Sequence, residues 1–192
     1  SEHKIVVYSG NNEGDNVQFC FEKVNQLLDE GIRPDEILFL YRRSKMFVPY
    51  FSKFKNERIK IQGKTIHASK GLESKVVFIV GLTEGSGGFP DVWLEDRIFQ
   101  IIKRANHDLL LEEERRLFYV AVTRAEKRAT ISFATSRYKW GNLTACEQSR
   151  FIDEIDERYV ERPARAKWNR LSEDVQPKTA KPSYPPKQVK PT

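Results

Sequence analysis

Residues 65–73, TIHASKGLE, place four polar side chains at spacings that could serve phosphate chemistry. Hydroxyl, imidazole and ammonium groups donate hydrogen bonds to phosphates, and a carboxylate can accept one from a ribose hydroxyl. The four residues are Thr65, His67, Lys70 and Glu73. They come just before an apolar run at 76–80, and ligands of open α/β sheets gather near strand ends. A polar surface loop would use the same residue types, so residue types alone leave both interpretations open.

A second stretch, residues 112–125, reads EEERRLFYVAVTRA and contains Arg124 next to its end. An arginine at the end of a rigid helix, ahead of a strand, suits a group that neutralises charge on a transferred phosphate. The alternative is that Arg124 simply pairs with the negative end of the helix dipole. Arg115 and Arg116 follow Glu112 by three and four residues, which favours ordinary ion pairs on a helix surface.

Residues 63–65, GKT, imitate the end of a phosphate-binding loop. The motif requires a glycine at position 58, where the chain has Arg58, and a helix directly after the Lys-Thr pair. We expect Ile66 and His67 to continue an extended segment instead. The sequence therefore predicts no phosphate loop here.

Alternating apolar runs predict the elements that must position these residues. Strands are expected at 4–8, 37–41, 59–61, 76–80 and 129–133. Helices are expected after an Asp15 cap and ending at Gly31, and at 44–55 with a start delayed by Pro49, 96–104, 110–123 and 150–155. Residues 81–90 should form a glycine-rich loop, in which Phe89 either stacks on a base or joins the core. Strands alternating with helices predict an α/β fold with a parallel sheet flanked by helices.

The charge of the chain is unevenly distributed. The 192 residues carry a net charge of +6, and residues 158–192 hold nine Lys/Arg against three Asp/Glu, which is also +6. Residues 1–157 are therefore neutral overall. A neutral domain can still carry a local basic groove, but charge alone does not show one. Six of the nine prolines lie in 158–192, so we predict one domain at 1–157 and a basic, disordered tail at 158–192.

Two cysteines, Cys20 and Cys146, fit neither a metal pattern nor a disulfide framework. Cys20 falls on the apolar face of a predicted helix and is expected to be a core thiol. Free thiols are typical of a reducing compartment, so a cytoplasmic location is expected. No apolar run reaches the length of a membrane helix, and no membrane association is predicted.

Together, the two stretches resemble motifs V and VI of the UvrD/Rep/PcrA-like helicases of superfamily one. Residues 40–44, LYRRS, resemble the L-Y-R segment after motif IV, and residues 149–155, SRFIDEI, resemble the end of the second motor domain. The resemblance covers nearly all of residues 4–155 and implies a second RecA-like domain. Only about 20 residues separate Ser44 from Thr65, so the long insert of larger members is absent. Together with residues 65–70 and 80–90, this short connection makes the chain look closest to the helicase IV branch.

The resemblance also implies roles for single residues. Arg124 would contact the γ-phosphate of ATP, while Glu73 and Gly71 would lie at the nucleotide. Single-stranded DNA, or a junction of single and double strands, would contact the residues Thr65, His67, Lys70, Arg42 and Ser44. The Mg²⁺ ligands and the phosphate loop would belong to an N-terminal RecA-like domain that this chain lacks. The chain alone is therefore expected not to hydrolyse ATP.

The function implied is that of an ATP-dependent DNA helicase or translocase moving 3′ to 5′. One alternative is an ATPase of helicase IV type that acts on RNA polymerase, with the tail as a tether to this protein partner. Another is a binding module without enzymatic activity.

Overall fold

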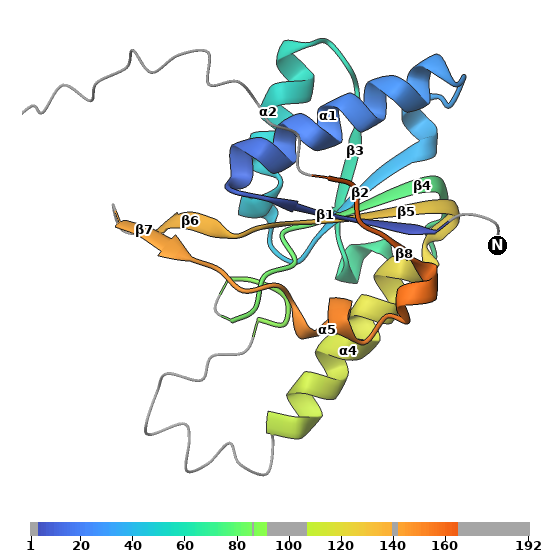
Figure 1. Cartoon of the computed structure of the whole chain (residues 1–192). Coiled ribbons are helices and arrows are strands. Elements are labelled where there is room, and N and C mark those ends of the chain that lie inside the picture. Colours follow the sequence, from blue (N-terminus) through green and yellow to red (C-terminus); the bar gives the residue numbers. More distant parts are fainter. Residues whose placement is uncertain (1–3, 86, 92–106, 140–141, 165–192) are drawn as a thin grey trace, which may run out of the picture.

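The computed structural model describes residues 4–85, 87–91, 107–139 and 142–164. Its centre is a six-stranded parallel sheet in the order β3-β2-β4-β5-β1-β8 (Figure 1). The strands are β1 (Ile5–Gly10), β2 (Ile37–Tyr41), β3 (Gln62–Thr65), β4 (Ser74–Val80), β5 (Ala125–Ala134) and β8 (Val160–Glu161). The predicted α/β class and the parallel sheet are therefore confirmed.

Helices cover both faces of the sheet (Figure 1). α1 (Glu13–Asp29) and α2 (Val48–Asn56) lie on one face, and α4 (His107–Thr123) and the short α5 (Arg150–Asp153) on the other. The buried strands β2 and β4 alternate between the two cores: Leu38 and Ile79 face α4, whereas Phe39 and Phe78 stack together under α1 and α2. Residues buried on both faces explain why these strands are continuous apolar runs.

Helix α1 starts three residues earlier than predicted. Asn12 is its cap and accepts a hydrogen bond from the backbone N–H of Asp15 at 3.0 Å. Asp15 instead reaches back to the N–H of Asn11, so it supports the cap without being it. The predicted end is confirmed, because the helix stops at Asp29 and Gly31 has a φ of +86°.

The chain between β2 and β3 follows the prediction for the helix but not for the strand. A 3-10 turn, η2 (Ser44–Met46), comes first, and α2 then starts at Val48 with Pro49 in its first turn. β3 lies at Gln62–Thr65 rather than at 59–61. Its residues Gln-Gly-Lys-Thr pair only with β2 at the sheet edge, so no apolar pattern marks them.

The expected extended segment at Ile66 and His67 is wrong. Ile66 has α-helical angles and η3 (His67–Ser69) forms a 3-10 turn. The Thr65 hydroxyl accepts from the N–H of Ala68 at 3.3 Å, and the Ser69 hydroxyl donates to the carbonyl of Ile66 at 2.6 Å. These side-chain bonds to the backbone favour a turn over an extended strand.

The C-terminal part holds more strands than predicted. β5 begins at Ala125 rather than 129, and a two-stranded antiparallel sheet follows, β6 (Ser136–Lys139) with β7 (Asn142–Ala145). After α5 and the 3-10 turn η4 (Glu157–Tyr159), β8 pairs in parallel with β1, and Val160 is buried. Ordered structure therefore extends past the domain boundary predicted at residue 157.

The helix predicted at 96–104 and most of the predicted tail lie outside the described residues. Within the described part, no helix has the length and apolar character needed to cross a membrane.

Candidate functional site

The predicted site residues divide between the two edges of the sheet. Thr65 ends β3, and Arg42 and Ser44 follow the end of β2, so these three lie at the carboxyl edge. Glu73 directly precedes β4 and Arg124 directly precedes β5, at the amino edge. Residues 66–73 connect the two edges, because they run from the end of β3 to the start of β4.

Arg124 joins the two sequence stretches. Its Nε donates to the carbonyl of Val120 at 3.1 Å, and its Nη1 donates to the carbonyl of Leu72 at 3.2 Å. Its own carbonyl accepts from the N–H of Ser74 at 3.0 Å. The guanidinium is therefore fixed between the end of α4 and the segment that leads into β4.

Glu73 and Arg124 precede neighbouring strands at matching positions. Ser74 and Ala125 are partners in the β4–β5 ladder, and Glu73 and Arg124 come directly before them. The Glu73 side chain is exposed. Gly71 has a φ of +82°, which favours glycine and turns the chain so that Leu72 can meet Arg124. A carboxylate and a guanidinium thus lie at neighbouring strand starts.

The other predicted contacts lie at the carboxyl edge and in the connection that leaves it. His67 and Lys70 are exposed in and after η3, and Thr65 is half-buried. The Thr65 hydroxyl oxygen accepts a bond from the backbone, so its proton can still be donated to a ligand. Ser44 is exposed at the start of η2.

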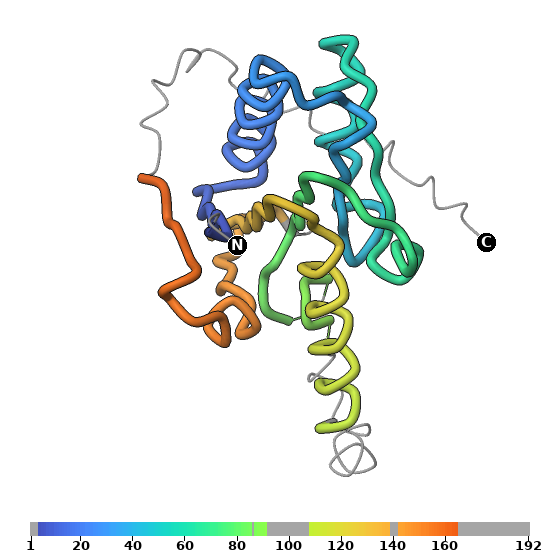
Figure 2. Tube along the Cα trace, turned by 90° about the vertical axis from the view of Figure 1, so that its right-hand side faces the viewer, coloured from blue at the N-terminus to red at the C-terminus, as the bar shows by residue number. Residues whose placement is uncertain are grey.

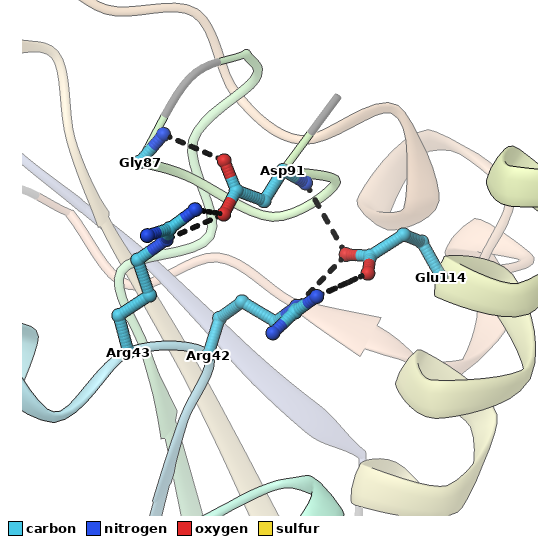
Figure 3. A network of polar contacts seen from close by, with 5 residues as sticks. All are labelled: Arg42, Arg43, Gly87, Asp91 and Glu114. Atoms are coloured by element: carbon cyan, nitrogen blue, oxygen red, sulfur yellow. Dashed lines mark hydrogen bonds and ion pairs between the residues drawn. The ribbon is translucent and has the colours of Figure 1, made fainter. Parts of the chain in front are cut away.

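Arg42 is engaged inside the protein (Figure 3). Its Nη2 lies 2.7 Å from Oε1 of Glu114 in α4, and its Nε is 3.1 Å from both carboxylate oxygens. The exposed fractions of the two side chains are 22% and 10%. The hydrogen bonds to Glu114 raise the pKa of Arg42 above its usual value. The guanidinium therefore ties β2 to α4.

Asp91 extends this network (Figure 3). Its backbone N–H donates to Glu114 at 3.2 Å, and its Oδ1 accepts from the N–H of Gly87 at 2.9 Å. Its Oδ2 accepts from Nε of Arg43 at 2.5 Å. Three segments meet here: the end of β2, the glycine-rich loop and α4.

Sequence reasoning missed Glu114 and Asp91. A signal existed for Glu114, because helical spacing places it in one stripe with the buried residues Phe118 and Ala121. A carboxylate in an apolar stripe indicates a buried partner of opposite charge. Asp91 follows the cis bond between Phe89 and Pro90 and carries no comparable signal.

The contacts of Phe89 and Arg115 decide two alternatives that the sequence left open. Phe89 is 1% exposed and packs against Phe118 and Phe151, so it belongs to the core rather than to a base-stacking surface. Arg115 pairs with Glu112 and, at 2.7 Å, with Glu154, as expected for a salt-bridged surface.

Gly63 explains the apparent phosphate-loop motif. It lies in β3, and a Cβ atom there would come within 2.3 Å of the Phe47 ring. The glycine therefore makes room for an aromatic side chain, and only the short 3-10 turn η3 follows Thr65, not the α-helix that a phosphate loop requires.

Buried polar groups elsewhere show no link to the site. Cys20 is fully buried as predicted, 3.9 Å from the Ser132 hydroxyl, and burial raises the pKa of its thiol. Within the described ranges, no group of three or more His, Cys, Asp or Glu residues could hold a metal ion. A hollow of about 750 Å³ between α1, η2 and the β6–β7 sheet contains none of the predicted site residues in its lining.

Comparison with known proteins places these features in a family context. Residues 49–136 match the family model described as the UvrD-like helicase C-terminal domain. This segment is related to the C-terminal domains of UvrD-like helicases. The UvrD-like segment contains Thr65, His67, Lys70, Glu73 and Arg124, whereas Arg42 and Ser44 precede it.

Curated proteins that are similar to this chain include DNA helicases. The ATP-dependent DNA helicase PcrA of Leuconostoc citreum is 44% identical over 97 residues, which are 50% of this chain and 11% of that protein. DNA helicase II of Escherichia coli K12 is 42% identical over 101 residues, 53% of this chain and 12% of that protein. The matched part of the chain thus spans only 11% to 12% of the length of these relatives.

A solved structure shares the fold. The C-terminal domain of a possible DNA helicase from Lactobacillus plantarum WCFS1 superposes with a TM-score of 0.55 and 13% sequence identity. The superposition covers 84% of this chain and 86% of that structure, so the shared fold extends beyond the 88 residues of the UvrD-like segment.

Proposed function

We propose that this chain is the C-terminal motor domain of an ATP-dependent DNA helicase or translocase that moves 3′ to 5′. The observation that supports it best is the bond from Arg124 to the carbonyl of Leu72. It holds a guanidinium beside Glu73 at the start of two neighbouring strands. This is an arrangement that could hold the γ-phosphate and the ribose of one nucleotide.

In this proposal, Arg124 neutralises charge on the γ-phosphate and Glu73 accepts a hydrogen bond from the nucleotide sugar. Gly71 shapes the turn between them. Two of the side-chain nitrogens of Arg124 donate to the protein backbone, which orients the guanidinium before a nucleotide arrives. A positioned arginine of this kind contributes about 10³–10⁵ in rate to phosphoryl transfer.

ATP and Mg²⁺ fit the described residues only in part. The described part of the chain offers a guanidinium and a carboxylate for the nucleotide but no metal-binding cluster. The ligands for Mg²⁺ would come from an N-terminal RecA-like domain of the same polypeptide, so this chain alone would not turn over ATP.

Single-stranded DNA would lie along the carboxyl edge. Thr65 offers a hydroxyl there, His67 offers an imidazole in the turn that follows, and Ser44 follows the end of the neighbouring strand. Lys70 would add an ammonium group from the connection that leads to Glu73. Residues 66–73 lead directly from this edge to Glu73, so DNA and nucleotide would contact opposite ends of one short segment.

The test is the ATPase activity of the full-length parent protein, with and without single-stranded DNA, comparing wild type with Arg124→Ala. We expect turnover stimulated by DNA and a loss of at least about 10³-fold in kcat in the variant, with ATP binding retained. Arg128→Ala is the matched control, because Arg128 lies four residues further along and also pairs on the surface, with Glu30.

Turnover that is indifferent to DNA and to Arg124 would contradict the proposal. It would leave α4 as a structural helix and favour a role in binding a protein partner such as RNA polymerase.

A further inference from the structure

The two consecutive arginines after β2 differ in what holds them (Figure 3). Arg42 uses Nε and Nη2 for Glu114, whose side chain is only 10% exposed. A phosphate could take Arg42 only by leaving a buried carboxylate without its partner, which is strongly unfavourable. Arg42 is therefore poorly suited to the DNA contact predicted for it.

Arg43 is in the opposite situation. Its side chain is 45% exposed, while its partner Asp91 is only 2% exposed. Both Nε and Nη2 of Arg43 point to one oxygen, Oδ2 of Asp91. The other edge of the guanidinium keeps its donors, because arginine has five N–H groups.

Asp91 is itself fixed. Its second oxygen accepts from the N–H of Gly87, and its own N–H donates to Glu114. A buried, doubly held carboxylate limits the rotamers of Arg43, so little side-chain entropy is lost when an anion binds.

Arg43 also lies in the right place. Tyr41 at the end of β2 pairs with Thr65 of β3 on one side and with Val80 of β4 on the other. Arg43 follows Tyr41 by two residues, between the turn that carries His67 and the glycine-rich loop. The proposed DNA contacts of the carboxyl edge therefore flank it.

We infer that Arg43, oriented by Asp91, binds a phosphate of single-stranded DNA, and that Arg42 instead fastens β2 to α4 through Glu114. This inference rests on the proposed function. It names a residue for the DNA track and gives the neighbouring arginine a structural role.

The experiment measures binding of the complete 192-residue chain to a fluorescent oligothymidine by anisotropy, over a series of salt concentrations. Arg43→Gln should bind several-fold more weakly and lower the slope of log affinity against log salt by roughly 0.7, the value for one phosphate contact on a single strand. Arg43→Lys should keep the slope, because the positive charge remains.

Two controls separate binding from folding. Arg33→Gln removes another surface arginine paired with an aspartate, Asp35, on the far side of β2, and should leave affinity and slope unchanged. Arg42→Gln should lower the unfolding temperature and leave the slope unchanged. If Arg43→Gln alone fails to fold because Asp91 is left unpaired, the double variant Arg43→Gln with Asp91→Asn removes both charges and should show the same loss of slope.

The possible outcomes distinguish a failure of the proposed function from a failure of the inference about Arg43. A wild-type chain that does not bind oligothymidine contradicts the proposed function. A wild-type chain that binds, with an unchanged slope in Arg43→Gln and in the double variant, overturns the inference but leaves the proposed function standing. A slope lost in Arg42→Gln and kept in Arg43→Gln overturns it as well.

Discussion

At the scale of single residues, the nature of the partner decides what a side chain can do. Arg124 is bound by two backbone carbonyls, which carry no net charge, so its positive charge stays available for a phosphate. Arg42 is held by the carboxylate of Glu114, whose side chain is only 10% exposed and would lose its partner if Arg42 turned to a phosphate. Two arginines with the same residue type thus have different chemistry.

Cys20 and Cys146 should differ in reactivity because one is buried and the other is partly exposed. Burial raises the pKa of the Cys20 thiol, whereas Cys146 is only half-buried. Because the thiolate is the reactive form, a thiol reagent at pH 8 should modify one cysteine of the native chain quickly and the second only after unfolding. Cys146→Ser should abolish the fast phase; a fast phase that persists in this variant would show that Cys20 is accessible.

Glu36 should make stability depend on acid pH. Its carboxylate accepts from Lys75 at 2.5 Å and from the N–H of Arg33, and these bonds lower its pKa. A lowered pKa in the folded state stabilises the protein above the unfolded value, near 4.3, and this stabilisation is lost as the pH falls through the folded pKa. Urea unfolding of wild type and Glu36→Gln should therefore differ at pH 6 and converge towards pH 3.

The same convergence is expected for Lys75→Gln, which removes the partner. A difference between wild type and Glu36→Gln that stays constant from pH 6 to pH 3 would show that the pair makes no pH-dependent contribution.

At the scale of elements, α4 connects the two edges of the sheet. Glu114 contacts Arg42 at the carboxyl edge, and Arg124 follows the helix at the amino edge, ten residues further on, or about 15 Å along a helix. Phe118 packs into the core between them. Figure 2 shows the first turns of α4 projecting away from α1 and α2. A shift of α4 would therefore affect both edges of the sheet together.

The glycine-rich loop depends on Phe89 for its anchorage. Phe89→Ala should lower the free energy of unfolding by about 3–5 kcal/mol, because a fully buried aromatic ring is removed. Phe51→Ala is the control, since Phe51 is 49% exposed in α2 and its loss should cost clearly less. Chemical denaturation measures both, and equal losses would contradict the assignment of Phe89 to the core.

At the scale of the whole molecule, most of the net positive charge lies outside the part of the chain that the structure describes. Residues 165–192 hold seven Lys/Arg and two Asp/Glu, a net charge of +5 out of the total of +6. The remaining residues 1–164 therefore carry +1. Long-range attraction to a polyanion should come from the C-terminal segment, whereas positioning should come from the sheet edges.

Replacing the five lysines of residues 165–192 by glutamine should weaken binding to oligothymidine and reduce its salt dependence, because fewer counterions are released. Length is unchanged in this variant, so an effect of chain length is excluded. A variant with five surface lysines of residues 1–164 replaced is the comparison. Equal losses in the two variants would contradict a dominant contribution from the segment.

The sequence by itself determined the strands that are buried on both faces and the residue types of the site. Runs such as 37–41 and 76–80 are apolar at every position, so local pattern alone predicts them. The resemblance of residues 65–73 and 112–125 to helicase motifs likewise needed no coordinates, and the match of residues 49–136 to the UvrD-like domain supports it.

Only the tertiary structure decided which partners hold these side chains inside the protein. Leu72 and Arg124 are 52 residues apart, and Arg42 and Glu114 are 72 apart. Neither contact has a local pattern, because each depends on strand order and on the position of α4 over the sheet. The edge strand β3 was missed for a related reason: its Gln-Gly-Lys-Thr residues are held by pairing with β2 and by no apolar face of their own.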